Sequence, residues 1–373
     1  MVRALAQGGT ERQLTETVRF LDRERFTPYV GCLIADGMRK AEIEQAGVPL
    51  VTFPVTSFMN ASMLRGAVQL ISFIRRNDIR LVHTYDVPMN LFGLLPARLA
   101  CTPVVLSSQR AHRELTRPKI GRYIQRLTDR FVDGVVVNCE AMRAHLTRDE
   151  GVSDGRIFVC RNGIDVNIYH PAPVERPAFL KSGLTIGVVC ALRPEKGLGT
   201  LVEAFAQVQR EFRDVKLVIV GSGSEEVPLK QRVASLGVSE SCHFEPATRD
   251  VAQWLRCIDI FVLPSLSEAL SNSLMEAMAC GCCPVASRVG GNPELVNPET
   301  TGLLFEAGDA GDLAAQLRKL IGNEDLRRRY ADASAALIAS DFTHRASAAR
   351  MGEIYADNLR RKISDKRETL AAS

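Results

Sequence analysis

The chain of 373 residues is 46% hydrophobic and 24% charged, which is ordinary for a soluble globular protein, and its length predicts two or three domains. A net charge of +4 is too small for a nucleic-acid-binding protein. The sequence has no run of roughly eighteen uncharged apolar residues, the length that spans a bilayer, and its beginning lacks the apolar core of a secretion signal. These features argue against a nucleic-acid partner and against a membrane-spanning chain.

The ten cysteines are scattered, and several lie in apolar runs typical of strands. Buried, reduced thiols are typical of cytosolic proteins, so we expect a cytoplasmic location. Cys280, Cys282 and Cys283 cluster, but the chain has no CxxC motif and no histidine at ligand spacing near them. We therefore expect no metal site at this cluster.

In the first half of the chain, short apolar runs alternate with helical patterns. Strands are predicted at residues 29–35, 49–54, 79–84, 103–108, 134–138 and 156–160, with helices between them, for example at 11–25, 64–76 and 89–99. Strands that are apolar throughout predict a parallel sheet covered on both faces. Only MVRALAQ precedes Gly8 and Gly9, so we expect the first strand of this domain to be shortened or missing.

Residues 107–131 contain a cluster of basic residues. Seven arginines and lysines face only Glu114 and Asp129, and apolar residues recur at helical spacing. The pattern predicts a basic amphipathic helix near residues 117–130, which favours peripheral contact with an anionic membrane surface. A solvated, charged helix face is an equally open alternative.

A second α/β pattern follows a proline-rich segment at residues 162–183, which reads as a linker. Strands are predicted at 184–190, 216–221, 242–245, 259–264, 283–287 and 302–306, and helices from Asp309 to the end. The sequence thus predicts an α/β fold of two tandem doubly wound, Rossmann-like domains that face each other across a cleft. The predicted boundaries are 1–168, 169–340 and a C-terminal helix and tail at 341–373.

Two motifs of the second domain follow predicted strands. In CALRPEKGLGTLVEAF (190–205), Arg193 and Lys196 come just after a buried strand, where cations can pair with phosphates; a solvated turn is the alternative. In VIVGSGSEE (218–226), Gly221 and Gly223 match a dinucleotide fingerprint only in part, and two glutamates there would repel a pyrophosphate. We interpret this second motif as a tight turn.

The stretch SEALSNSLMEAMACG (267–281) begins a helix after a predicted strand. One interpretation is a capping box, in which Ser273 caps the helix and Glu276 bonds a free amide. The other is a ligand site, in which the amides around Ser271–Leu274 bind a diphosphate at the positive helix end and glutamates accept hydrogen bonds from sugar hydroxyls. The stretch alone leaves both interpretations open.

Taken together, the motifs resemble the family-four retaining glycosyltransferases, whose two-Rossmann-domain fold is of the GT-B type. The resemblance covers nearly the whole chain, and the motifs occur in the family's order: GGTERQ (8–13), VHTYD (82–86), CRNGID (160–165), LRPEKG (192–197), VGSG (220–223), VLPSLSEALSNSLMEAMACGCCPVAS (262–287) and VGGNPELV (289–296). The resemblance implies a C-terminal helix that returns to the first domain. It also implies a nucleotide-diphospho-sugar donor, so we expect the transfer of a hexose-type sugar from UDP or GDP. Because the basic helix near 117–130 favours membrane contact, we expect a lipid-linked or polysaccharide acceptor.

The resemblance assigns roles to individual residues. Lys196 and Arg193 would neutralise the leaving diphosphate, Glu268 would hold donor-sugar hydroxyls, and Glu276 would bind the ribose. The donor-binding set it implies is Gly8, Gly9, Arg193, Lys196, Ser271, Asn272, Ser273, Leu274 and Glu276. The chain contains no Asp-x-Asp triplet, the usual metal–diphosphate clamp, so we expect neither a metal nor another cofactor.

The sequence also departs from the family pattern. Many relatives carry an arginine where Ala191 stands, and a histidine near the donor sugar where this chain has SSQRAH (107–112). We assign Arg110 to that position as a catalytic residue. His112 lies near it, and His83 either points into the cleft or packs at a strand end.

Two alternative functions remain open from the sequence. A nucleotide-sugar epimerase has the same two-domain layout but needs acid–base residues around the sugar that we cannot place. A non-catalytic sugar-nucleotide or glycan-binding protein is the second alternative. Release of nucleotide with and without acceptor separates all three.

Overall fold

The computed structural model describes residues 1–6, 8–110 and 129–371, with side chains described up to residue 364. The chain forms two compact units: unit 1 comprises Met1–Gly163 and His344–Ser373, and unit 2 comprises Ile164–Thr343. Each unit is described by itself. The predicted boundaries, after residues 168 and 340, fall close to these junctions. The basic helix predicted near 117–130, and His112, fall almost entirely outside the described residues.

Unit 1 contains two parallel sheets. The first has the order β1-β2-β3, formed by β1 (Val2–Ala4), β2 (Val30–Ile34) and β3 (Leu50–Thr52). The second has the order β4-β5-β6-β7, formed by β4 (Leu81–Thr84), β5 (Val104–Gln109), β6 (Gly134–Val137) and β7 (Ile157–Val159). The first strand is present, with three residues, and the amide of Tyr85 donates to the carbonyl of Met1 at 2.9 Å.

Helices connect the strands of unit 1. They are α1 (Gly9–Phe20), α2 (Arg39–Gln45), α3 (Ala61–Arg76), α4 (Val87–Leu99) and α6 (Glu140–Asp149). Asn60 caps α3 by accepting a hydrogen bond from the amide of Ser62, and Asp86 caps α4 through the amide of Met89. These two caps fix where α3 and α4 start, whereas α1, α2 and α6 have no side-chain cap. None of the described helices is long and apolar enough to cross a membrane.

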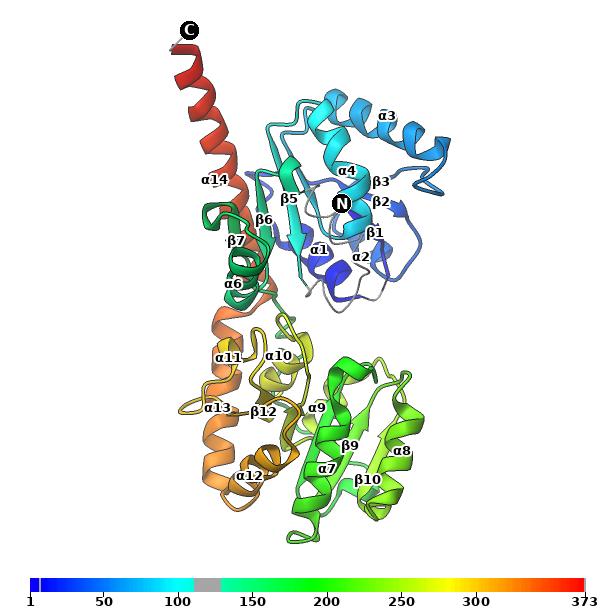
Figure 1. Ribbon diagram of the computed structural model, residues 1–373, viewed down its shortest axis with the longest axis vertical. Coiled ribbons are helices and arrows are strands. Elements are labelled where there is room, and N and C mark those ends of the chain that lie inside the picture. Colours follow the sequence, from blue (N-terminus) through cyan, green and yellow to red (C-terminus); the bar gives the residue numbers. More distant parts are fainter. Residues whose placement is uncertain (7, 111–128, 372–373) are drawn as a thin grey trace. The chain divides into compact units, whose positions relative to one another are not determined.

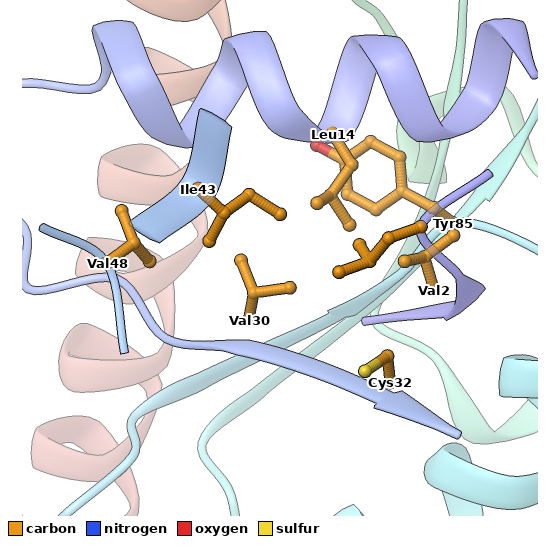
Figure 2. Close-up of a cluster of buried hydrophobic side chains, with 8 residues drawn as sticks. Val2, Leu14, Val30, Cys32, Ile43, Val48 and Tyr85 are labelled. Atoms are coloured by element: carbon orange, nitrogen blue, oxygen red, sulfur yellow. The ribbon is translucent and has the colours of Figure 1, made fainter. Parts of the chain in front are cut away.

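The core of unit 1 lies between the first sheet and helices α1 and α2. Figure 2 shows Val2 and Val30 of the sheet facing Leu14 of α1 and Ile43 of α2, with the Tyr85 ring closing one end. All five side chains are buried. Burial of each such side chain stabilises the fold by about 1.5–3 kcal/mol, so this cluster holds α1 on the sheet.

The C-terminal helix α14 (His344–Ala371) belongs to unit 1. Its residues Met351, Ile354 and Tyr355 are buried in one cluster with Val104 and Leu106 of β5. Lys362 pairs with Asp133 at 2.9 Å and adds a polar contact to the apolar one. The predicted return of the C-terminal helix to the first domain is therefore confirmed.

Unit 2 contains one parallel sheet of six strands, in the order β10-β9-β8-β11-β12-β13. The strands are β8 (Thr185–Val189), β9 (Lys216–Val220), β10 (Cys242–Glu245), β11 (Ile260–Leu263), β12 (Cys283–Ser287) and β13 (Leu303–Phe305). Every residue of β8, β11 and β12 is buried, so both faces of the sheet are covered. This order is the 3-2-1-4-5-6 order of a doubly wound domain, and the fold prediction is confirmed.

The helices of unit 2 are α7 (Leu198–Gln209), α8 (Glu226–Ser235), α9 (Val251–Arg256), α10 (Asn272–Ala279), α11 (Asn292–Leu295), α12 (Ala310–Ile321) and α13 (Glu324–Asp341), as Figure 1 shows. The segment predicted as a linker packs on this unit from Ile164 onward. Its Arg176 pairs with Asp259 at 2.6 Å, and the amide of Ile164 donates to the carbonyl of Phe342 at 2.9 Å. The proline-rich segment is thus an ordered part of unit 2.

Candidate functional site

The strand order of unit 2 determines where a ligand can bind. From β8 the chain proceeds to β9 and β10 on one side, and then crosses to β11, β12 and β13 on the other side. The connections after β8 and β11 therefore leave in opposite directions, and a crevice opens between them at the carboxyl ends of these two strands. The motifs around Lys196 and Glu268 follow these two neighbouring strands.

Lys196 and Glu268 form an ion pair at this crevice. Lys196 ends the short 3₁₀ turn Pro194–Lys196 after β8, and its Nζ donates to Oε1 of Glu268. The hydroxyl of Ser265, which is fully buried, donates to the same carboxylate oxygen at 2.9 Å. The Lys196 and Glu268 side chains are only 15% and 12% exposed, so each requires the other's charge in this setting.

Backbone contacts lock the two loops together. The amide of Leu266 donates to the carbonyl of Glu195 at 2.9 Å. Gly197 has φ +61°, and a Cβ added there would lie 2.3 Å from the carbonyl oxygen of Pro264. Only glycine permits both this conformation and this close approach. The position of Lys196 beside Glu268 is therefore built into the backbone.

Helix α10 begins at Asn272, directly beyond Glu268, and Ser271 is its N-cap. The Ser271 hydroxyl accepts from the amide of Leu274 at 3.4 Å and lies 3.2 Å from the Ser273 hydroxyl. The capping-box interpretation, with Ser273 as the cap, is therefore wrong, because the helix starts two residues earlier. Glu276 then lies beyond the first turn, where it is 6% exposed. The cap satisfies the amide of Leu274, and the start of α10 carries the partial positive charge of a helix N-terminus.

Arg193 lies at the rim of the site. Its side chain is 58% exposed and pairs with Glu195 at 2.9 Å. An exposed arginine on this loop is free to reorient toward an anion, whereas Lys196 is already held in place. The structure thus shows that the two cations differ, because Lys196 is held within the site whereas Arg193 is exposed at its rim.

The loop after β9 supports the site through glycines. Gly221 has φ +147°, and a Cβ there would lie 1.9 Å from the carbonyl oxygen of Cys190. A Cβ on Gly223 would lie 2.2 Å from the carbonyl oxygen of Leu192. The close packing of this turn on the loop after β8 explains both glycines, in agreement with the tight-turn interpretation.

Gly8 and Gly9 lie at the start of α1 in unit 1. Gly8 is the N-cap, with φ −64° and ψ 159°, and has no capping side chain. A Cβ added to Gly8 would meet only the carboxylate of Glu11. Neither glycine has the left-handed conformation, so the backbone itself does not demand them. The carboxylate of Glu11 lies close to this helix start, so a phosphate that binds the start of α1 would have to displace it.

Arg110 follows β5 and is held by two contacts. Its Nη1 donates to Oδ1 of Asn162 at 2.6 Å, and its guanidinium lies 5.3 Å from the centre of the Tyr85 ring. Asn162 belongs to the NGID segment after β7, and Gln13 of α1 donates to the carbonyl of Gly163 in that segment at 2.8 Å. The ends of β5 and β7 and helix α1 thus form one polar cluster.

Two more buried amide side chains lie in this region; the sequence placed Gln109 near the position of the family histidine without a role, and it did not single out Asn138. Gln109 ends β5 and Asn138 follows β6; they are 4% and 1% exposed. Both amide atoms of Gln109 and the Oδ1 of Asn138 lack a hydrogen-bond partner. Unpaired buried amides are uncommon because each costs about 1–3 kcal/mol. A polar amide side chain at or just after the carboxyl end of a buried strand was the signal that could have identified them.

His83 is packed inside unit 1. Its Nδ1 lies 2.8 Å from the hydroxyl of Tyr355 and its Nε2 lies 2.9 Å from the hydroxyl of Ser108, and it is 6% exposed. Burial, with a smaller contribution from the positive charge of Arg110, lowers the pKa of His83 well below its usual value. The strand-end packing alternative therefore describes this histidine.

The clustered cysteines are buried thiols. Cys280, Cys282 and Cys283 are each at most 5% exposed, and burial raises the pKa of Cys280 and of Cys283 to about 12. Across the described part of the chain, no group of three or more histidine, cysteine or acidic side chains is arranged to hold a metal ion.

Sequence comparison assigns the chain to a family. A profile described as glycosyl transferases group 1 matches residues 175–336, and one described as glycosyltransferase family 4 matches residues 7–168. Together the two profiles cover nearly all of both units. The chain belongs to the group 1 glycosyltransferases.

Curated relatives of this group 1 glycosyltransferase include the N-acetyl-alpha-D-glucosaminyl L-malate synthase of Bacillus anthracis. It is 33% identical over 168 residues, which are 45% of this chain and 44% of the relative. The alpha-maltose-1-phosphate synthase of Mycolicibacterium smegmatis is 28% identical over 83% of this chain and 86% of the relative. Apart from the latter, the chain spans about half the length of the first curated relatives it matches.

Solved structures share the fold. HepE of Anabaena, in complex with UDP and glucose, has a TM-score of 0.79 at 20% identity, covering 95% of this chain and 99% of that one. A glycosyltransferase of Rickettsia africae has a TM-score of 0.81 at 19% identity, covering 96% and 98%. The group 1 glycosyltransferase described here therefore has the GT-B type of fold.

Substitution of Gly197 tests the locked loops. Gly197→Ala places a side chain in a left-handed conformation, at a cost of about 1–2 kcal/mol, and against the Pro264 carbonyl. We expect the urea midpoint of unit 2 to fall, measured by the fluorescence of Trp254, the single tryptophan of the chain. Gly199→Ala, with no atom closer than 4.0 Å to the new Cβ, is the matched control and should stabilise α7 by up to about 1 kcal/mol. Equal midpoints for the two variants would contradict this account.

A titration tests the neutral state of His83. Its folded pKa lies below the unfolded value of about 6.5, so the unfolded chain binds the proton first as the pH falls. The free energy of unfolding therefore has its full contribution from neutral His83 above about pH 6.5. Below that pH it declines by up to about 1.4 kcal/mol per pH unit. We expect His83→Gln to remove this part of the pH dependence in urea unfolding followed by circular dichroism. Parallel stability curves for the two proteins would show that His83 is not held neutral.

Proposed function

We propose that this chain is a retaining glycosyltransferase that transfers a hexose-type sugar from UDP or GDP to a lipid-linked or polysaccharide acceptor. The observation that carries the proposal is the Lys196–Glu268 pair at the crevice between β8 and β11, next to the start of α10. This arrangement combines a cation and helix amides, which suit a diphosphate, with a carboxylate, which suits sugar hydroxyls.

In this proposal, the donor diphosphate lies between Lys196 and the first-turn amides of α10, around Ser271–Leu274. A lysine ammonium has three donors, so Lys196 can keep Glu268 and still bond a phosphate oxygen. Glu268 accepts from hydroxyls of the donor sugar, and the buried Glu276 accepts from the ribose. Arg193, at the rim, supplies the second positive charge after reorienting from Glu195.

The chemical step breaks the bond between the anomeric carbon and a diphosphate oxygen and forms a bond to the acceptor oxygen. The acceptor proton leaves with the diphosphate when attack occurs on the leaving-group side, which retains the configuration. Positive charge develops on the sugar and negative charge on the diphosphate. Lys196 and the α10 amides are preset for that negative charge, Arg193 adds its charge after it reorients, and all of them lower the barrier.

Unit 1 supplies the acceptor side in this proposal. Arg110 is held by Asn162 beside the Tyr85 ring, and Gln109 and Asn138 present unpaired amides at the neighbouring strand ends. Gly8 and Gly9 lie at the start of α1, where a phosphate would take the place of the Glu11 carboxylate. The UDP and glucose bound by HepE of Anabaena, and the sugar-transferring names of the curated relatives, support this choice of donor and reaction.

Paired variants test the donor site. Lys196→Ala and Glu276→Ala should each lower the rate of acceptor-dependent nucleotide release by roughly 100- to 1,000-fold, because each removes a buried polar contact to the donor. Lys230→Ala is the matched control, since Lys230 forms an exposed pair with Glu226 on α8 and should have no effect. The donor is first chosen by thermal shift with UDP, GDP and ADP and their sugars.

The outcomes separate the alternatives. Nucleotide release that needs an acceptor supports a transferase, interconversion of the donor sugar without release supports an epimerase, and a thermal shift without turnover supports a binding protein. Full activity of both variants would remove Lys196 and Glu276 from the site.

Removal of metal tests the second part of the proposal. Because Lys196, Arg193 and the α10 amides take the charge of the diphosphate, we expect the rate to be unchanged after dialysis against a chelator. Addition of Mg²⁺ should not raise the rate. A rate that falls with chelation and returns with Mg²⁺ would show that these groups are insufficient.

A further inference from the structure

Large apolar side chains are exposed on helices α3 and α4 of unit 1 and on the loop before α3. We name this group the α3–α4 face, and it consists of the exposed residues Phe58, Met59, Leu64, Val68, Leu91, Leu95 and Leu99. Met59 is 97% exposed, Leu64 is 69% exposed and Leu95 is 50% exposed. Large apolar side chains that are exposed singly need no explanation, but a contiguous group of them marks an interaction site.

The spacing of these residues gives α4 an unusual outer surface. Leu91, Leu95 and Leu99 are four residues apart and so lie on one side of the helix. In α4, whose residues are all described, these three leucines are the exposed positions. Surface helices normally place polar residues on that side, and a helix that is apolar all round requires a cover.

The apolar residues of α3 continue the same surface. Leu64 and Val68 are four residues apart on α3, which packs side by side with α4 (Figure 1). A Cβ on Gly66 would lie 3.2 Å from the Phe92 ring of α4, so the two helices approach closely at this level. At their other ends, Arg75 donates to the carbonyl of Leu99 at 2.9 Å. Gly66 approaches Phe92, and farther along both helices Arg75 reaches Leu99, so α3 and α4 run in the same direction along their contact.

The charged residues within the two helices have one sign, although Arg98 pairs with Asp133 at 2.8 Å and the exposed Asp78 follows α3. Helices α3 and α4 contain four arginines, at positions 65, 75, 76 and 98, and no aspartate or glutamate. Arg65 and Arg76 are exposed, and Arg75 reaches over to α4. The nearby Asp86 is engaged in capping, with bonds from the amides of Met89 and Arg3. An apolar stripe bordered by arginines matches a surface that is apolar inside and anionic at its boundary.

We propose that the α3–α4 face binds the surface of an anionic lipid bilayer. Met59, Leu64 and Leu95 enter the boundary between head groups and acyl chains, and the arginines pair with lipid phosphates. A second copy of the chain is a poorer occupant, because a two-fold contact would bring the arginines of one copy against those of the other. The proposal depends on this surface alone and holds whichever donor the site in unit 2 binds.

Vesicle flotation of the full chain tests the proposal. We expect binding to vesicles of phosphatidylcholine with about one-third phosphatidylglycerol, and at least roughly tenfold weaker binding to phosphatidylcholine alone. The double variant Leu64→Gln/Leu95→Gln should bind the anionic vesicles at least about tenfold more weakly, since two leucines no longer enter the apolar boundary. Val227→Gln, at a 64% exposed position of α8 in unit 2, is the matched control and should bind as the parent does.

Variants in which two arginines of α3 are replaced by glutamate provide a second test of the proposal. Arg65→Glu/Arg76→Glu should remove the preference for anionic vesicles while keeping the fold, which circular dichroism checks, and the thermal shift with nucleotide. Equal binding of the parent to both vesicle types, absence of binding, or undiminished binding of the leucine variant would each overturn the proposal. A dimer in light scattering that dissociates in the leucine variant would identify a second copy as the occupant instead.

Discussion

The divergence of the chain after β8 and β11 is the constraint on which the site depends. The two strands are hydrogen-bonded neighbours, but the segments that follow them leave in opposite directions. A cation on one segment and a carboxylate on the other can therefore meet over the sheet, as Lys196 and Glu268 do. Buried strands supply the rigidity, since a side chain of β8 or β11 cannot shift without opening the core. The buried, apolar strands beneath Lys196 and Glu268 therefore fix the positions of these two side chains.

Glycines allow the loops of the site to pack closely on one another. At Gly197 a side chain would meet the Pro264 carbonyl, and at Gly290, which has φ +52°, it would meet the carbonyl of Glu268. Each loop of the site thus packs directly on the backbone of the next loop. Such packing leaves the α10 start and the Lys196 ammonium in place before any ligand arrives. Preset charges of this kind need no reorganisation during a reaction, which is the main source of electrostatic catalysis.

Much of the fold was predictable from the sequence because it depends on local patterns. All the predicted strands occur, since apolar runs of four to seven residues between turn signals have few other structures available. The exact start of α10 was not predictable, because Ser271, Asn272 and Ser273 are all good caps and only tertiary packing selects Ser271. The hydrogen bond between His83 and Tyr355 could not be predicted either, because the two residues are 272 positions apart in the sequence. Periodicity identifies elements, whereas contacts between distant elements require the three-dimensional structure.

The α3–α4 face shows a different limit of sequence reasoning. The segment VPMNLFGLLPARL is apolar on every side, a pattern that is typical of a helix buried in a protein core. The structure buries Phe92 and Leu94 but leaves Leu91, Leu95 and Leu99 exposed. Sequence therefore indicates that the outer side of this helix needs an apolar environment, and the structure shows that the described part of the chain does not provide one. Because neither helix contains a carboxylate and both contain arginines, a partner that carries negative charge fits this face best.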